Sequence, residues 1–312
     1  MLEISHFSYG WVTPVLAYIM SVTGCLLGLR CTARARTGEG RRGWLIAAAV
    51  AIGGTGIWVM HFIAMLGFSI HGATLRYDVP VTLLSAAIAM GVVWIGLAIV
   101  ATGGWGGWEL PVGGTITGLG VGAMHYSGMY AMRSDAIIDY NVGLVSLSMV
   151  IAVVASIVAL WFTLNINGIL ATIGAALIMG VAVCGMHYTG MAAMSAHHAD
   201  HASMPHGAGA MELLAPLMVS VSTVTMVLLI HVGLTEVDEA SRVKEPVRPE
   251  PVRHDPWSLQ ANSTDLPDDP AVSRPNPVAP QQYSVAHNPE PYQYPQPPLY
   301  APERGGYPPR LS

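Results

Sequence analysis

The sequence Met-His-Tyr-Ser-Gly-Met at residues 124–129 has two close copies elsewhere in the chain. Residues 60–65 read Met-His-Phe-Ile-Ala-Met, and residues 186–191 read Met-His-Tyr-Thr-Gly-Met. The copies begin at positions 60, 124 and 186, so they are 64 and 62 residues apart. A membrane-spanning helix needs about 20 residues, and this interval therefore fits two helices with their connections. The repeat predicts three helical pairs of one orientation, whose motifs lie on the same side of a membrane.

The composition of the chain supports a membrane location for these helices. Of its 312 residues, 52% are hydrophobic and only 11% are charged, whereas a soluble domain carries about 25% charged residues. This sparse charge excludes an ordinary soluble enzyme and a disordered protein. A net charge of −5 without a large basic cluster excludes a nucleic-acid partner, and three cysteines exclude a disulfide framework. The chain is therefore expected to be a polytopic membrane protein, with the lipid bilayer as its surroundings.

Long uncharged stretches define the predicted helices. No Asp, Glu, Lys or Arg occurs at residues 79–108 or 141–199. We predict an all-α bundle of seven transmembrane helices, formed by three two-helix repeats and one more helix. Their expected ranges are 11–29, 44–66, 80–102, 112–132, 143–164, 169–194 and 212–234. Residues 67–79, 133–142 and 195–211 are expected to be outer loops.

The positive charges predict the orientation of the bundle. Five arginines lie between the first two predicted helices, at positions 30, 34, 36, 41 and 42. Basic residues next to short spans stay in the cytoplasm. The N-terminus is therefore expected outside the cell, and the C-terminus inside, in the inner or plasma membrane. The first ten residues contain no Lys or Arg and no convincing cleavage site, so the first helix is expected to be retained.

Residues 244–312 are predicted to form a disordered, proline-rich cytoplasmic tail. Residues 245–312 contain 17 of the 22 prolines in the chain. Such a segment buries too little apolar surface to offset its ordering entropy. Two interpretations remain open: the tail binds a separate cytoplasmic signalling protein, with the prolines near Pro295 as the best candidate segment, or it is a solubilising segment without a specific partner.

The spacing within each motif copy predicts a metal site. The histidine and the last methionine of each copy are four residues apart and therefore share a helix face. The candidate ligands are His61, His125, His187, Met60, Met65, Met124, Met129, Met186 and Met191. Met132 and Met194 follow at i+7 as additional candidates on the same stripe. Three such helices with their motifs at a common depth are expected to converge on one site.

Imidazole and thioether together favour copper, and Cu(I) in particular, over magnesium, calcium or manganese. These neutral groups also cost less inside a membrane than carboxylates do. Other interpretations remain open. Methionine is a common filler of apolar cores, a single helix histidine is more often hydrogen-bonded than metal-bound, and duplication of an ancestral helical pair would also produce the repeat. His197, His198, His201 and His206 form a further cluster, which either captures metal or is a solvated loop.

The triple Met-His-Tyr motif in a seven-helix bundle resembles the bacterial MHYT sensor domain. The resemblance covers residues 7–235 and implies an inner-membrane sensor that binds copper at these motifs and senses oxygen, carbon monoxide or nitric oxide. Tyr126 and Tyr188 complete the family pattern and are possible additional ligands. The first copy departs from it, since Phe62 replaces the tyrosine and Ala64 replaces the glycine.

The resemblance also implies how such a domain signals. Members of this family often carry a cyclic-di-nucleotide module or a histidine kinase, whereas a proline-rich segment follows the bundle here. No nucleophile and base pair is visible in the predicted helices, so no catalytic residue and no enzyme activity is expected. The alternative function is a membrane protein that transports or handles copper or another soft metal, which predicts ligands at several depths. Haem ligation by two of the histidines is a third possibility.

Overall fold

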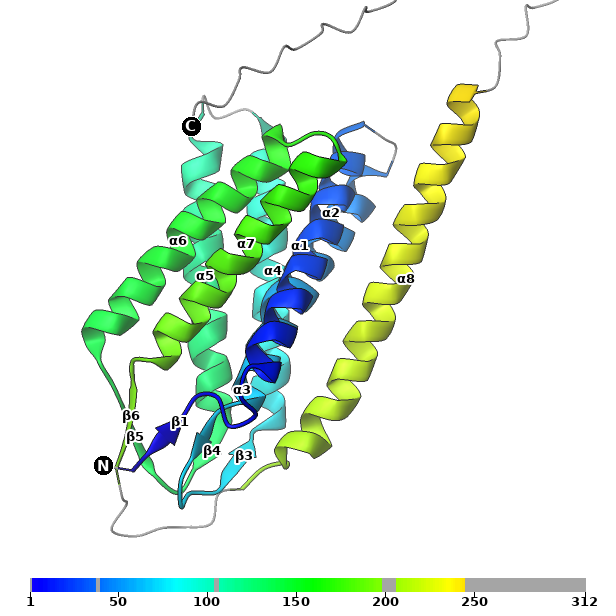
Figure 1. The fold of residues 1–312 in the computed structure, drawn as a ribbon. Helices are drawn as coiled ribbons and strands as arrows, with labels where there is room; N and C mark the ends of the chain where they lie inside the picture. The colour runs from blue at the N-terminus through cyan, green and yellow to red at the C-terminus, as the bar shows by residue number, and fades with distance from the viewer. Residues whose placement is uncertain (1, 38–39, 104–106, 198–205, 245–312) are drawn as a thin grey trace, which may run out of the picture. The chain divides into compact units, whose positions relative to one another are not determined.

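The computed structural model describes residues 2–37, 40–103, 107–197 and 206–244. Within them lie α1 (Val12–Thr37), α2 (Arg41–Ala49), a π-helix η1 (Val50–Val59), α3 (Met60–Leu66), α4 (Val79–Thr102), α5 (Glu109–Ala131), α6 (Val142–Asn165), α7 (Ile169–Met191) and α8 (Ala210–Lys244). Because α2, η1 and α3 follow one another without a break, the elements form seven helical rods (Figure 1).

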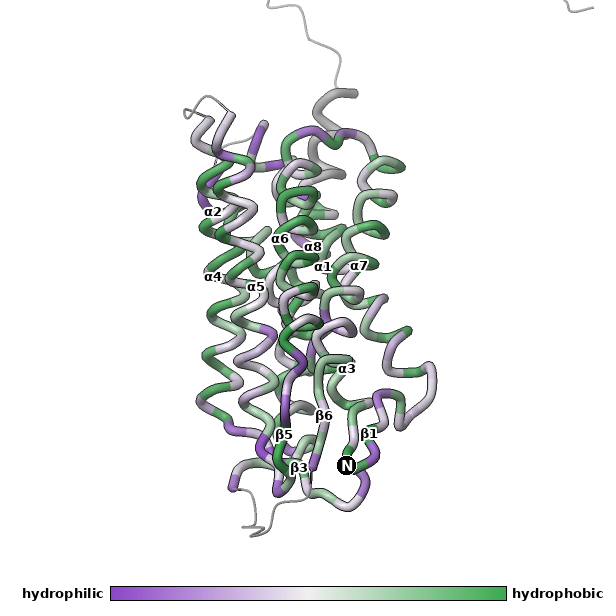
Figure 2. Tube along the Cα trace, turned by 90° about the vertical axis from the view of Figure 1, so that its left-hand side faces the viewer, coloured by the Kyte–Doolittle hydropathy of each residue, from purple (hydrophilic) through white to green (hydrophobic). Residues whose placement is uncertain are grey.

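The predicted all-α membrane bundle is confirmed. In the described part of the chain, six rods are long and apolar enough to cross a membrane, and the glycine-rich α5 is the seventh. Figure 2 shows hydrophobic residues along the rods and hydrophilic residues concentrated toward their ends. Two helices end eight or more residues beyond their predicted ranges: α1 continues to Thr37 and α8 to Lys244. Apolar composition marks only the membrane-embedded part of a helix, whereas backbone hydrogen bonding continues into the polar residues beyond it.

Each repeat contains a pair of short strands as well as a pair of helices. The strands are β1 (Ile4–Ser5), β2 (Ser69–Ile70), β3 (Leu75–Tyr77), β4 (Met132–Ser134), β5 (Ile137–Tyr140) and β6 (Met194–His197). They form three antiparallel pairs, β1 with β2, β3 with β4 and β5 with β6. Each pair joins the segment before a repeat to the segment after it. The prediction of plain loops was wrong here, because strands of two to four residues are too short to show an alternating pattern.

The same backbone contact closes the three repeats. In each repeat, the carbonyl six residues after the motif histidine accepts a hydrogen bond from the N–H of a residue near the start of the first helix. The pairs are Ser8 with Gly67 at 2.9 Å, Asp78 with Ala131 at 2.8 Å and Asn141 with Ala193 at 2.8 Å. The three motifs therefore lie at one end of the bundle. We call it the strand end, and we call the opposite end, where α1, α4 and α6 terminate, the arginine end.

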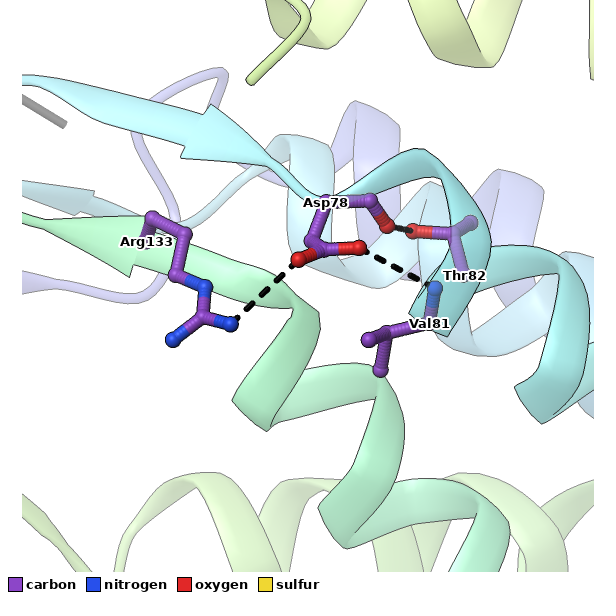
Figure 3. A network of polar contacts seen from close by, with 4 residues as sticks. All are labelled: Asp78, Val81, Thr82 and Arg133. Atoms are coloured by element: carbon purple, nitrogen blue, oxygen red, sulfur yellow. Dashed lines mark hydrogen bonds and ion pairs between the residues drawn. The ribbon is translucent and has the colours of Figure 1, made fainter. Parts of the chain in front are cut away.

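Asp78 anchors the second repeat at the strand end (Figure 3). Its carboxylate caps α4 by accepting a hydrogen bond from the Val81 N–H at 3.2 Å, and it pairs with the Arg133 guanidinium at 3.3 Å. Its carbonyl accepts from the Thr82 hydroxyl at 2.8 Å. Arg133 also lies 4.7 Å from the Tyr130 ring centre. These contacts join the start of α4 to β4, directly after the motif helix α5.

The π-helix η1 packs closely against two neighbours. A Cβ on Gly24 of α1 would lie 2.3 Å from the Gly56 nitrogen, and a Cβ on Gly53 would lie 2.7 Å from the Ala89 oxygen of α4. Glycine at positions 24 and 53 therefore allows the backbones to touch. A π-helix of ten residues is unusual, since most are single turns inside α-helices. It leads directly into α3, which carries the first motif.

The last helix, α8, packs on the first repeat. The Thr55 and Thr225 hydroxyls lie 2.7 Å apart, and the Trp44 and His231 rings stack at 5.2 Å. The predicted proline-rich tail from residue 245 onward lies outside the described residues, as does the histidine-containing segment 198–205.

Candidate metal centre

The structure brings together the three predicted histidines. His61 on α3, His125 on α5 and His187 on α7 have ring nitrogens that all lie within 4.8 Å of one another. The Nδ1 atom of His61 lies 3.0 Å from that of His187 and 3.2 Å from that of His125. The three side chains are 0 to 1% exposed. In the described part of the chain, this is the one group of three or more His, Cys, Asp or Glu side chains that are close enough to share an ion.

The three rings have nearly threefold symmetry. Their centres are 4.9, 5.1 and 5.1 Å apart, and their planes meet at 81 to 85°. Each ring therefore presents its edge to a neighbour in the same way. This arrangement follows from the repeat, because three equivalent helix faces place the same side chain around a common axis.

The other ring nitrogen of each histidine has no partner. The Nε2 atoms of all three are buried and make no hydrogen bond. The Nε2 atom of His61 faces Gly128, where a Cβ would lie 2.4 Å away, and that of His125 faces Gly190, where a Cβ would lie 2.3 Å away. The glycine three residues after a motif histidine thus makes room for the histidine of another copy.

The polar atoms of this cluster are unusually poorly satisfied. A neutral imidazole offers one donor and one acceptor, yet His61 Nδ1 lies within hydrogen-bond distance of two other Nδ1 atoms. A buried polar atom without a partner costs about 1–3 kcal/mol, and three such Nε2 atoms lie here. Such groups are few in native proteins, and a bound ion or a catalytic role is one of the explanations for them. Three converging neutral donors without a carboxylate fit a soft cation better than a hard one.

The aromatic residue after each histidine packs on it in all three copies. The ring centres of His61 and Phe62 are 4.8 Å apart, those of His125 and Tyr126 4.9 Å, and those of His187 and Tyr188 5.0 Å. The Tyr126 hydroxyl pairs with the Ser148 hydroxyl on α6 at 2.6 Å, whereas the Tyr188 hydroxyl is buried without a partner. Phenylalanine can therefore replace tyrosine in the ring contact. Ser148 is a residue that the sequence did not single out.

The six motif methionines are all buried, with 1 to 2% of each exposed. Met60 packs with Ala17 and Ala64 and against Cys184, while the other five belong to the main apolar core. Met132 and Met194 do not continue the helical stripe. They begin strands β4 and β6, because α5 ends at Ala131 and α7 at Met191. The prediction that both lie on the motif helices was therefore wrong, although both side chains are buried.

Two of the other predicted histidines, His197 and His206, do not join the cluster. His197 lies on β6 with its Nε2 atom 3.6 Å from an Asp139 oxygen, and His206 is exposed. His198 and His201 lie outside the described residues. A different histidine, His6, has a buried and unpartnered Nδ1 atom, and burial lowers its pKa. The sequence offered no signal for His6, since it precedes the first repeat.

The sequence comparisons match the repeat seen in the structure. The family described as "Bacterial signalling protein N terminal repeat", MHYT, matches residues 54–113 and 118–176. These two segments contain the first and second motif copies. Residues 54–176 of this chain carry two MHYT repeats. The third copy of the MHYT motif, at residues 186–191, lies beyond both matched segments, but the structure places its histidine in the same cluster.

Curated relatives of this MHYT domain are signalling proteins. MucR of Pseudomonas aeruginosa, a bifunctional diguanylate cyclase/cyclic di-GMP phosphodiesterase, is 39% identical over 193 residues, which are 60% of this chain and 28% of MucR. The cyclic di-GMP phosphodiesterase NbdA of the same organism is 39% identical over 147 residues, 45% of this chain and 19% of NbdA. The signaling protein YkoW of Bacillus subtilis is 27% identical over 201 residues, 62% of this chain and 25% of YkoW.

The chain thus spans less than a third of the length of each of these relatives. The similarity is to their MHYT region. No solved structure matches the chain.

Proposed function

We propose that this multi-pass MHYT domain is a membrane sensor that holds copper at the three-histidine cluster and responds to oxygen, carbon monoxide or nitric oxide. The convergence of three buried imidazoles carries the proposal. Ring nitrogens within 4.8 Å of one another on three separate helices form a shared donor set that packing alone does not require.

The donor set favours Cu(I). Imidazole nitrogen and thioether sulfur are neutral ligands that suit this ion, and no carboxylate belongs to the cluster. A monovalent ion therefore leaves less uncompensated charge in the membrane than a divalent ion would. His61, His125 and His187 would hold the metal. The six motif methionines are all buried and are candidates for additional soft ligands. Bound copper would supply an open coordination position for a diatomic ligand.

The residues of the chain itself prepare this site. The strand pairs and the closing backbone contacts fix the ends of α3, α5 and α7. Phe62, Tyr126 and Tyr188 hold the imidazole planes by edge contacts. Near-complete burial excludes water from the rings. A site shared by three helices also couples an event at the cluster to the packing of all three repeats.

We further propose that the strand end faces the outside of the cell. The arginines at the end of α1 and the start of α2 support this orientation, because basic residues next to short spans stay in the cytoplasm. The guanidinium of Arg36 at the opposite end donates to the Ile166 carbonyl at 2.9 Å, and that of Arg41 donates to the Ala101 carbonyl. The arginines thus contact the ends of α4 and α6, so the positive charge is concentrated at one end of the bundle.

A sensor fits the cluster better than a copper transporter does. Transport would need binding groups at several depths, and the three histidines lie in one layer, each close to the end of its helix. An output to a separate cytoplasmic signalling protein is part of the proposal. We propose no catalytic role for the cluster, because its side chains are buried from water and none of them is placed as a nucleophile.

Metal analysis of the purified chain tests the proposal. Wild type and His125→Ala/His187→Ala are loaded with Cu(I) in detergent, washed and analysed for copper and zinc. We expect copper in the wild type and its loss in the double variant, which retains one imidazole. Gly185→Ala is a matched α7 control, since a Cβ at this position meets no atom within 4 Å. Equal copper in the wild type and the double variant would overturn the proposal.

A further inference from the structure

An apolar cavity of about 50 Å³ lies inside the helix bundle, next to the histidine cluster. It is bounded by residues of α1, η1, α4, α5, α6 and α7, none of them charged. A site needs roughly 10–15 Å³ by this measure to hold a water molecule, so the cavity has room for a larger guest. Its size and lining raise the question of what it holds.

The cavity lies on the axis of the histidine cluster. Ile57, Val121 and Val183 line it, and each is four residues before a motif histidine. Residues four apart share an α-helix face, so Val121 and Val183 lie about 6 Å, roughly one helical turn, below the imidazoles of His125 and His187. Ile57 lies near the end of the π-helix that leads into the first motif. Thr117 and Met179, eight residues before His125 and His187, extend the lining by a further turn.

The polar side chains of the cavity lining are those of Cys25, Thr117, Ser156 and Thr163. The Thr117 hydroxyl donates to the Gly113 carbonyl at 2.8 Å, and the Thr163 hydroxyl donates to the Leu160 carbonyl at 2.7 Å. Their donors are therefore used within their own helices. Apolar cavities of this kind stay dry and bind small apolar molecules.

A groove on the lipid-facing side adjoins the same cavity. It has a volume of about 320 Å³, lies between α6 and α7, and is lined entirely by apolar side chains. Val150 and Val154 on α6 and Ile178 on α7 are more than half exposed there. Ala155, Met179 and Ala182 line both the groove and the cavity, so two of the three separating side chains are single methyl groups. The exposed apolar side chains face the hydrocarbon region of the membrane.

The path from the arginine end is less suited to an apolar guest. A second cavity of about 120 Å³ lies there and shares Leu97 and Thr163 with the central one. Its lining includes Arg36 and Arg41. Guanidinium groups at this entrance favour water and anions over apolar solutes.

We propose that the central cavity is a docking site for uncharged molecules of diatomic size, which enter from the bilayer through the groove between α6 and α7. A guest there lies one helical turn below the imidazoles. The further step, from this cavity to a ligand position at the cluster, rests on the proposed function. Binding in the cavity and entry through the groove do not depend on copper.

Xenon binding to copper-free protein in detergent tests the proposal. Crystals pressurised with xenon show whether xenon occupies the cavity. Xenon NMR measures how fast xenon exchanges between the cavity and its surroundings. Ala152→Leu fills the cavity, since Ala152 is 2% exposed and lines it but not the groove. Val154→Phe narrows the groove without lining the cavity. Val181→Phe is the matched control on α7, because Val181 is 62% exposed and lines neither. Ala159→Leu replaces Ala152→Leu if that variant does not fold.

We expect xenon in the cavity of the wild type, Val154→Phe and Val181→Phe, and its loss when the cavity is filled. Exchange should be slower in Val154→Phe alone. An empty cavity in pressurised wild-type crystals would refute the docking site. Unchanged exchange in Val154→Phe would refute entry between α6 and α7. Since copper is absent throughout, failure of the copper proposal would leave these outcomes unaffected.

Discussion

The first repeat differs from the other two although all three supply one histidine to the cluster. Its motif helix is entered through the π-helix Val50–Val59, whereas α5 and α7 are α-helical up to their motifs. It has Phe62 and Ala64 in place of the tyrosine and glycine. It also packs against α8 through Thr55. The imidazole position is thus the shared requirement, while the residues around it vary with their local neighbours.

The largest expected effect on copper retention comes from replacing the glycines of the second and third motif copies. We predict that Gly128→Ala and Gly190→Ala displace the rings of His61 and His125, because the added Cβ would lie 2.4 and 2.3 Å from their Nε2 atoms. Overpacking of this kind costs about 1–3 kcal/mol. Copper retention should fall strongly in both variants, as measured by metal analysis after washing.

The control for this prediction is Gly185→Ala, which adds the same methyl group on α7 where no atom lies within 4 Å. It should retain copper and unfold at the same or a slightly higher temperature, since alanine favours a helix by up to about 1 kcal/mol over glycine. If all three variants behave alike, the glycines do not make room for the histidines.

Alkaline pH should lower the free energy of unfolding through Tyr77, which lies on β3 and contacts the first motif copy. Its ring lies 6.3 Å from that of Phe62, and burial raises the pKa of Tyr77 to about 12. An unfolded tyrosine has a pKa of about 10. The free energy of unfolding should therefore not depend on Tyr77 below pH 10 and should fall by up to about 1.4 kcal/mol per pH unit between 10 and 12.

Tyr77→Phe checks this assignment, because it removes the ionisable group and retains the ring. Unfolding in detergent, followed by tryptophan fluorescence, should lose part of its alkaline pH dependence in this variant. Identical pH profiles for the variant and the wild type would show that Tyr77 titrates normally.

At the aromatic position of the motif, replacing phenylalanine by tyrosine should reduce stability more than replacing tyrosine by phenylalanine. Phe62→Tyr places a hydroxyl at a site that is 0% exposed and should cost about 1–3 kcal/mol if that hydroxyl finds no partner. Tyr126→Phe is the matched reverse change. It removes one end of the Ser148 hydrogen bond and should cost about 1 kcal/mol. Chemical unfolding compares them, and a Phe62→Tyr variant as stable as the wild type would contradict the assigned packing.

The smallest expected effect is that of Ala64→Gly, which gives the first copy the glycine of the others. The first copy already supplies its histidine with alanine at this position. Copper binding should therefore change little, and the helix should lose up to about 1 kcal/mol of stability. A large gain in copper retention would show that Ala64 constrains the cluster, and that the three copies are less equivalent than their ring geometry indicates.

The repeat explains how much of this fold the sequence could predict. Three copies of one motif at near-constant spacing predicted the paired helices, their common orientation and the meeting of His61, His125 and His187. Apolar runs then located the seven rods. Both signals depend on periodicity over many residues, which is strong in helices that face lipid on one side and a core on the other.

Features set by a few residues were not predictable in the same way. Met132 continues the helical spacing in the sequence, but β4 begins there because its pairing with β3 replaces helical hydrogen bonding. The π-helix has no composition that distinguishes it from an α-helix. The role of Gly128 and Gly190 was visible only as a pattern, glycine at the third position after histidine, until the structure placed a ring against each.

X-ray absorption at the copper edge tests the central claim most directly. We predict that the copper-loaded wild type shows imidazole nitrogen in the first coordination shell. The imidazole signal should decrease in each of His61→Ala, His125→Ala and His187→Ala, because one ion is shared by all three repeats. A copper spectrum that lacks imidazole, or that stays the same in all three variants, would contradict the account.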